Sequence, residues 1–110
     1  MIAIKDLYWL AGIIEGEGTF GYYNSKRNRL AYPRVKVKMT DEDVVRKCHE
    51  ISGVGRVFGP YKADETRKES WSWVVQDQAS AGGLMMTLYS LMGKRRQAKI
   101  HECLTAWLGN

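Results

Sequence analysis

The chain has 110 residues and a formal net charge of +5. This length suits one domain with a self-sufficient core, so a single domain over residues 1–110 is predicted. The sequence contains no apolar run long enough to cross a membrane and no secretion signal, which predicts an intracellular protein without a membrane partner. The positive balance favours a polyanionic partner, although many basic proteins bind no nucleic acid.

The first helix is predicted from apolar residues at helical spacing, which are Trp9, Leu10, Ile13 and Ile14. Asp6 is expected to cap this helix, and after Gly18 the pattern changes to the alternation of a strand. Glu15 and Glu17 fall at the end of the helix, where its partial negative charge disfavours acids. A positive group is therefore expected near these two acids.

Two glycines lie on one face of this helix, because Gly12 and Gly16 are four residues apart. In a helix interior each costs about 0.5 to 1 kcal/mol relative to alanine, which favours the close approach of another backbone. If the same helix of a second subunit approaches across a two-fold axis, two Glu17 side chains meet at that axis. Two carboxylates repel each other unless a cation or a shared proton intervenes, and oxygen ligands suit Mg²⁺.

Strands and helices then follow in an αββαββα order with one extra helix. Residues 18–24 and 32–39 are predicted to form a hairpin joined by residues 25–31. No acid occurs between Glu17 and Asp41, whereas six cations do: Lys26, Arg27, Arg29, Arg34, Lys36 and Lys38. The last three alternate with Val35, Val37 and Met39 and so share the wet face of the second strand. Protection of an exposed sheet edge is one use for them, but the basic connection extends the same charge and favours an anion-binding face.

A second helix is predicted to begin after Thr40, which matches the N-cap of a capping box with Asp43 three residues later. It should run through Ile51 and end at Gly53. Asp41 then has a simple interpretation as an acid favoured in a first helical turn.

A second hairpin is predicted from residues 55–62 and 69–76, joined by the polar turn Ala63 to Lys68. Simple alternation puts Arg56, Phe58 and Lys62 on one face and Val57 and Tyr61 on the other. A further set shares one face of the last strand and is expected in a core or an interface: Trp71, Trp73 and Val75.

The last third is predicted to be helical, with two apolar stripes that belong to the core and do not form a cofactor site. The first stripe is Leu84, Met85, Leu88, Leu91 and Met92, and Gly93 is expected to end it. The second is Ile100, Cys103, Leu104, Trp107 and Leu108. Cys48 and Cys103 lack metal-ligand spacing and are expected to be reduced core residues.

Residues 10–18 resemble the LAGLIDADG motif of homing endonucleases, and five match that name letter for letter: Leu10, Ala11, Gly12, Ile14 and Gly18. The resemblance implies an α+β, αββαββα fold with a curved antiparallel DNA-binding sheet, to which this chain adds a C-terminal helix. Similarity to the single-motif branch implies a homodimer whose motif helices form the interface. The residues implied there are Trp9, Gly12, Ile13 and Gly16.

The same resemblance assigns roles to individual residues. The last acid of the motif, Glu17, would bind catalytic Mg²⁺ with the Gly16 carbonyl, and Mn²⁺ or Ca²⁺ would substitute for binding; no small-molecule cofactor is implied. Asp41 occupies the place of a polar residue that positions metal-bound water. Lys94 occupies the place of a lysine that approaches the active site, with Arg95 as the next choice. The implied DNA-binding residues are Lys26, Arg27, Arg29, Arg34, Lys36, Lys38, Arg56, Lys62, Arg95 and Arg96.

These expectations combine into one function, a site-specific double-strand DNA endonuclease. It would act as a homodimer on a palindromic or nearly palindromic target and leave short 3′ overhangs. Three alternatives stay open at this point. They are an RNA-binding maturase that aids intron splicing, a DNA-binding regulator of the same fold without catalysis, and a basic structural protein whose motif match is chance.

Overall fold

The computed structural model describes residues 2–62 and 64–110. In chain order these residues form α1 (Ile4–Glu17), β1 (Gly18–Asn24), β2 (Ala31–Met39), α2 (Glu42–Ser52), β3 (Arg56–Tyr61), β4 (Ser70–Val75), α3 (Gln78–Leu88), the short 3₁₀ helix η1 (Tyr89–Leu91) and α4 (Lys94–Leu108). The predicted αββαββα order with an extra C-terminal helix is confirmed, and so is the α+β class.

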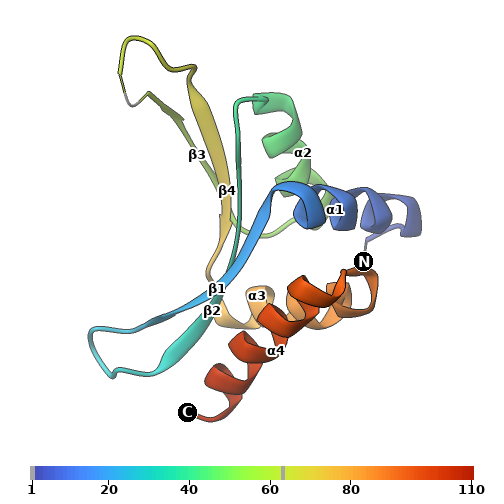
Figure 1. Cartoon of the computed structure of the whole chain (residues 1–110), viewed down its shortest axis with the longest axis vertical. Helices are drawn as coiled ribbons and strands as arrows, with labels where there is room; N and C mark the ends of the chain where they lie inside the picture. The colour runs from blue at the N-terminus through green and yellow to red at the C-terminus, as the bar shows by residue number, and fades with distance from the viewer. Residues whose placement is uncertain (1, 63) are drawn as a thin grey trace.

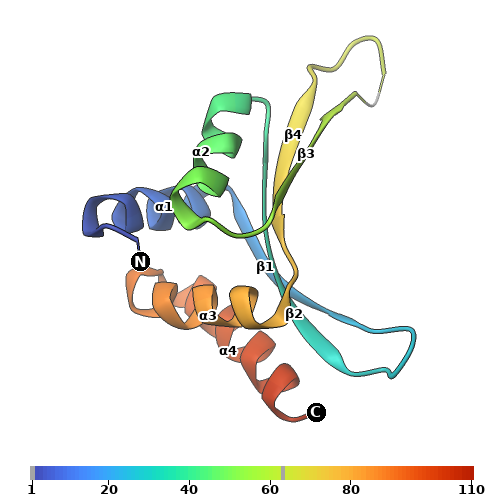
Figure 2. The same cartoon turned by 180° about the vertical axis from the view of Figure 1, so that it is seen from behind.

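The four strands form one antiparallel sheet in the order β1-β2-β4-β3. Gly18 pairs with Val37, and Val37 pairs in turn with Trp73, so the two hairpins meet at the middle of the sheet. Figures 1 and 2 show that the helices lie on one side of the sheet, while the two hairpins diverge and both bend toward the other side. One face of the sheet is therefore covered by helices and the other is open.

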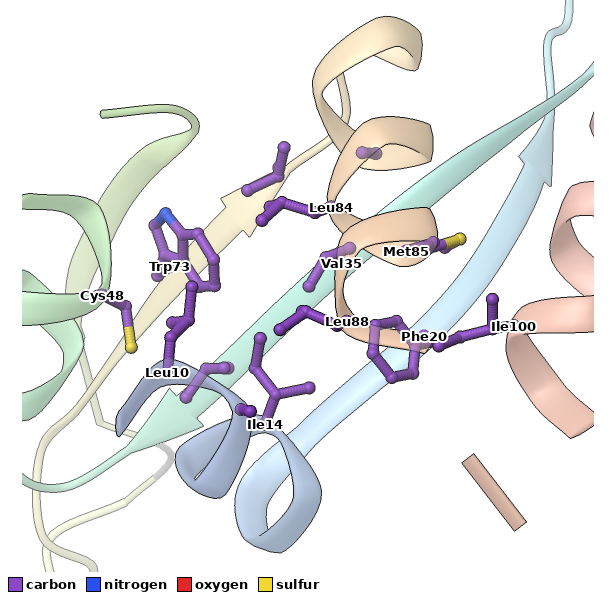
Figure 3. Packing of buried hydrophobic residues seen from close by; sticks show 14 of the residues in the cluster. Leu10, Ile14, Phe20, Val35, Cys48, Trp73, Leu84, Met85, Leu88 and Ile100 are labelled. Atoms are coloured by element: carbon purple, nitrogen blue, oxygen red, sulfur yellow. The ribbon is translucent and has the colours of Figure 1, made fainter. Parts of the chain in front are cut away.

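The core lies between the sheet and the helices (Figure 3). Helix α1 contributes Leu10, which lies beside Trp73 of β4, and Ile14, while Leu88 of α3 lies between Ile14 and Phe20 of β1. The indole of Trp73 is completely buried and donates a hydrogen bond of 2.9 Å to the Val54 carbonyl. Full burial of a leucine, isoleucine or phenylalanine side chain contributes roughly 1.5 to 3 kcal/mol. These contacts therefore stabilise the curved sheet and the end of α1.

The junction between α1 and β1 depends on glycine. The helix ends at Glu17, and the amide of Gly18 bonds the Ile14 carbonyl as the chain turns into β1. A Cβ added at Gly18 would lie 2.8 Å from both the Cα and the carbonyl oxygen of Ile14. Real Cβ atoms do not approach a backbone so closely, and the last position of the motif therefore needs a residue without a side chain.

Two predicted helix starts are wrong by a few residues. Helix α1 begins at Ile4 after Ala3, so Asp6 lies in the first turn and does not cap it. Helix α2 has Asp41 at its N-cap in place of Thr40, and no side chain caps it. Both helices begin without a side-chain hydrogen bond, which means that packing against the sheet fixes their starts more strongly than local capping does.

Of two glycines predicted to end helices, one does so and the other does not. Gly53 follows α2 in the left-handed conformation, with φ of 69°, and its amide bonds the His49 carbonyl, as the sequence predicted. Gly93 does not end a helix, because α3 already ends at Leu88 and η1 follows. Gly93 is the N-cap of α4.

In the second hairpin one facing prediction is wrong. Phe58 pairs with Ser72 and Tyr61 with Ser70, with a register irregularity between the two positions. Tyr61 therefore lies on the same face as Phe58, and the Lys38 ammonium lies 5.5 Å from its ring centroid. Ala63, the first residue of the expected turn, lies outside the described residues.

The expected inward face of β4 is confirmed. Trp73 and Val75 are completely buried, and the partly buried Trp71 packs against the core. Cys48 and Cys103 are free and buried, as predicted. Burial raises the pKa of the Cys48 thiol to about 11, so this thiol is neutral at neutral pH. No helix of the described ranges is both long and apolar enough to span a membrane.

Candidate nucleic-acid interface

The open face of the sheet presents its side chains in rows that cross the strands. Cross-strand partners point to the same face, so the pairing of Thr19 with Lys36, of Lys36 with Val74 and of Val74 with Arg56 forms a row over all four strands. A second row joins Lys38, Ser72 and Phe58. Each row mixes a cation with small or apolar groups, a combination that can contact both phosphates and base edges.

The charge of this face is one-sided. None of the four strands contains an acidic residue, and neither does the connection between β1 and β2. Within the part of the chain that the structure describes, no ion pair involves a side chain of this hairpin. Six predicted DNA-binding residues lie here, in the connection and on the open face of β2: Lys26, Arg27, Arg29, Arg34, Lys36 and Lys38. Their charges add without internal neutralisation.

A second basic cluster lies at the far end of the other hairpin. A hollow of about 460 Å³ is lined by Lys38, Tyr61, Lys62, Arg67, Lys68 and Ser70. Lys38 and Lys62 belong to the predicted DNA-binding set, whereas the sequence analysis did not single out Arg67, Lys68 or Tyr61 for this cluster. The signal for the two cations was present, because residues 62 and 67–68 flank one turn and hairpin pairing must bring them together. Tyr61 could not be placed, because alternation assigned it to the opposite face.

The turn of this hairpin carries acids that offset its cations. The amide and hydroxyl of Thr66 donate to the Asp64 carboxylate at 2.8 and 2.6 Å. These hydrogen bonds lower the pKa of Asp64, and the one from the Thr66 hydroxyl has the larger effect. Asp64 therefore keeps its negative charge at neutral pH. Arg67 lies 3.7 Å from Asp64, and Lys62 lies 4.0 Å from Glu65. Two of the four cations around the hollow are therefore partly neutralised within the turn.

Glu17 is an exposed residue at the end of α1, directly before β1. The last carbonyls of a helix, including that of Gly16, have no partner within the helix. These hard oxygen donors suit Mg²⁺. However, no group of three or more His, Cys, Asp or Glu residues in the described ranges could hold a metal. One chain therefore offers a fitting donor pair but not a complete site, which would need oxygens from a second chain or from the DNA.

The predicted dimer residues all reach the surface of α1. Trp9 and Ile13 are half-buried, and a Cβ added at Gly12 or Gly16 would meet no atom within 4 Å. Nothing in residues 2–62 and 64–110 therefore requires glycine at these two positions. The neighbouring Tyr8 is 60% exposed, so this side of the helix is largely apolar and uncovered apart from the Lys47 ammonium, which lies 4.4 Å from the centroid of the Trp9 ring.

The positive group expected near the acids of α1 is Arg96 of α4. Its Nε lies 3.6 Å from a Glu15 carboxylate oxygen, and one of its Nη atoms donates to the Gly18 carbonyl. The Arg96 side chain is only 12% exposed. Because its guanidinium contacts two groups of its own chain, Arg96 is not part of the DNA interface that we propose.

The remaining predicted residues lie at element ends. Lys94 and Arg95 are exposed in the first turn of α4, and Arg95 lines a hollow of about 510 Å³ beside the start of β1. Asp41 is exposed at the start of α2, and its carboxylate does not cap that helix. In the described ranges no hydrogen bond or ion pair joins the side chains of Glu17, Asp41 and Lys94.

Comparison with known proteins gives matches in structure only. No protein-family model matches the chain, and no curated protein matches it in sequence. The group I intron-encoded homing endonuclease I-CeuI, complexed with DNA, is 14% identical, with a TM-score of 0.66 over 92% of this chain and 53% of that one. The homing endonuclease I-CvuI, in complex with its target and calcium, is 17% identical, with a TM-score of 0.71 over 90% of this chain and 65% of that one. This chain has the LAGLIDADG homing endonuclease fold.

A third match is the LAGLIDADG homing endonuclease I-GzeII in complex with a DNA target. It is 16% identical, with a TM-score of 0.63 over 90% of this chain and 34% of that one. The chain thus spans about half to two thirds of I-CeuI and I-CvuI and about a third of I-GzeII. At identities this low the structural overlap establishes only the fold. The predicted LAGLIDADG fold is confirmed.

Proposed function

We propose that the chain is a site-specific DNA endonuclease that acts as a homodimer on a palindromic or nearly palindromic target. The observation that carries this proposal is the exposed Glu17, which directly precedes a curved sheet whose open face carries cations and no acids. The DNA complexes of I-CeuI, I-CvuI and I-GzeII, which share the fold, support a DNA partner.

The open face binds the duplex in the major groove. A two-stranded ribbon fits that groove, and each chain of the homodimer provides two such hairpins. The cations of the first hairpin other than Lys36 contact phosphates and supply most of the affinity. The row of Lys36, Val74 and Arg56 reaches base edges, where Arg and Lys suit guanine and an apolar group suits the thymine methyl.

Two copies of α1 pack against each other through the uncovered side of this helix. Gly12 and Gly16 allow close approach of the backbones, and Trp9 and Ile13 supply apolar contact. A two-fold axis through this contact brings one Glu17 from each chain to the centre of the complex. The symmetry of the dimer then requires a palindromic or nearly palindromic site.

Glu17 and the Gly16 carbonyl of each chain would hold Mg²⁺, which would supply activation of a water molecule and neutralisation of phosphate charge. The Asp41 carboxylate accepts a hydrogen bond from the attacking water. The Lys94 ammonium lies against the negative charge that develops on the phosphate. Each Glu17 serves one strand, so the dimer makes a double-strand break with short 3′ overhangs.

The test can begin without a known target sequence. Duplexes that the chain binds in Ca²⁺ are selected from a random library, or taken from the DNA that flanks its gene, and are then incubated in Mg²⁺. We expect wild type to cleave both strands. Glu17→Gln should bind with an unchanged Kd but cleave about 10²- to 10³-fold more slowly, because a metal ligand contributes several kcal/mol. Glu50→Gln, at an exposed position on α2, serves as the matched control.

Full cleavage by Glu17→Gln with normal DNA binding would overturn the assignment of the metal ligand. A monomeric mass in solution and on DNA would overturn the homodimer. Binding of the selected DNA without cleavage by wild type would instead indicate a regulator of this fold, and a preference for RNA would indicate a maturase.

A further inference from the structure

Glu15 joins the end of α1 to the start of α4. One oxygen of its carboxylate accepts a hydrogen bond of 2.5 Å from the amide of Gly93, which is the N-cap of α4. The other oxygen lies 3.6 Å from Nε of Arg96, one turn further along α4. A single side chain of α1 therefore contacts the first turn of α4 at two points, although Glu15 and Gly93 are 78 residues apart in the chain.

Arg96 closes the same contact from the other side. Its guanidinium donates to the carbonyl of Gly18, the first residue of β1, and is largely buried. Nε of Arg96 is buried and makes no hydrogen bond within the described chain, so Glu15 at 3.6 Å supplies its compensating charge. The planar guanidinium can serve the Glu15 carboxylate and the Gly18 carbonyl together, whereas an ammonium could serve only one of them well.

The residues that make these contacts flank Glu17 and Lys94 in the sequence, and both of these have proposed catalytic roles. Glu15 and Gly18 flank Glu17 in α1 and β1, while Gly93 and Arg96 flank Lys94 in α4. Neither Glu17 nor Lys94 takes part in the contacts itself, and both side chains are exposed. Because consecutive Cα atoms are only about 3.8 Å apart, fixing the flanking residues also fixes the backbones that carry Glu17 and Lys94.

We propose that Glu15 and Arg96 form a clamp that holds Lys94 in a set position relative to Glu17. Both are positioning residues, since neither touches the DNA or the metal. The inference rests on the proposed function, which assigns Glu17 and Lys94 to cleavage. In this proposal Glu15, the first acid of the motif, positions Lys94, whereas Glu17, the last acid, binds the metal.

The clamp is tested with a double-mutant cycle on the cleavage step. Single-turnover cleavage rates and DNA Kd values are measured in Mg²⁺ and Ca²⁺ for wild type, Arg96→Met, Lys94→Met and the double variant. We expect Arg96→Met to slow cleavage about tenfold or more with an unchanged Kd, since misplaced catalytic groups lose rate steeply. In the Lys94→Met background the same substitution should have almost no further effect, because Arg96 acts through Lys94.

Three further variants separate positioning from a general structural role. Arg96→Lys keeps the charge but loses the planar fork, so its cleavage rate should lie between those of wild type and Arg96→Met. Glu15→Gln can still accept the Gly93 amide but loses the ion pair, and it should show the same dependence on Lys94. Arg46→Met removes an ion pair with Glu42 that lies wholly on α2, and its cleavage rate should equal that of wild type.

All rates are measured below the unfolding temperature of the least stable variant, with circular dichroism as the check on folding. Equal slowing by Arg96→Met in both backgrounds would overturn the clamp. A weaker DNA Kd with a smaller salt dependence would also overturn it, because that result marks Arg96 as a phosphate contact. A wild type that cleaves none of its selected duplexes would overturn the proposed function and the clamp together, whereas additive variants of a cleaving wild type would overturn only the clamp.

Discussion

The two hairpins share one open face but carry charge differently. The β1–β2 hairpin has six cations and no acid, whereas the turn of the β3–β4 hairpin places Asp64, Glu65 and Glu69 among its cations. Figure 1 shows the hairpins diverging from the middle of the sheet, so they would meet different parts of a bound duplex. The first hairpin therefore suits strong attraction to any phosphate backbone, while the second suits weaker and more local contacts.

The two hairpins also differ in the regularity of their strand pairing. The β1–β2 register is continuous from Gly18 opposite Val37 to Asn24 opposite Ala31. The β3–β4 ladder is irregular after Phe58, and the chain enters it through Gly55 at φ of 79°. A regular ribbon tolerates substitution of its outward side chains, whereas an irregular one depends on special backbone positions.

The largest expected effect comes from removal of the cations on β2. Alanine at Arg34, Lys36 and Lys38 should weaken DNA binding at least about 100-fold near physiological salt and lower the slope of log affinity against log salt by about 0.9 for each lost phosphate contact. Alanine at Lys62 and Arg67 should weaken binding about tenfold or less, because ion pairs within the turn already compete with phosphate for these two cations. Titrations of selected DNA at several salt concentrations measure both effects, and equal losses would remove the distinction between the hairpins.

The next effect concerns stability and uses two glycines as a matched pair. A Cβ at Gly55 would lie 2.6 Å from the Val74 carbonyl oxygen, and the residue has positive φ. Gly55→Ala should therefore lower the free energy of unfolding by about 3 kcal/mol. Gly21→Ala on β1 meets no atom within 4 Å and should be neutral or stabilising by up to about 1 kcal/mol. Guanidinium unfolding curves measure the difference, and a similar loss at both positions would contradict it.

The smallest effect is expected from the charge of one turn residue. Asp64→Asn should raise DNA affinity about two- to threefold at low salt, since it removes a phosphate-repelling charge and frees Arg67. Hydrogen bonds from Thr66 lower the pKa of Asp64, so its charge persists until the pH falls through this depressed value. The ratio of the two affinities should stay constant from about pH 8 to about 5 and decline only below the usual range of an aspartate. A ratio that declines already between about pH 7 and 5 would contradict this account.

The sequence predicted the parts of the fold that local periodicity determines. The change from helical to alternating spacing at Gly18 located the α1–β1 junction, and the strict alternation from Arg34 to Met39 gave the correct faces of β2. Alternation failed at Tyr61, because a register irregularity carries no periodic signal. The sequence predicts Thr40 as the N-cap in place of Asp41, because two residues that can cap a helix are adjacent there and only the packing of the helix decides between them.

Contacts between distant segments could not be derived from either segment alone. The field of the helix end predicted a positive group near Glu15, but nothing in the sequence identified Arg96 as that group. Arg96 is also among the predicted DNA-binding residues, because a run of cations in a sequence gives no sign of which side chain is buried. Arg67 and Lys68 were missed because their charges only join Lys38 and Lys62 once the hairpin has formed.

The central claim is that two identical chains each supply one Glu17 to one DNA strand. Mixed dimers of wild-type and Glu17→Gln chains, purified through different tags, test it on a supercoiled plasmid that carries a selected target. Nicked circles should accumulate as the product, because only one of the two sites retains its glutamate. Linear plasmid at the wild-type rate would contradict it, since both strands would then be cut without the second Glu17.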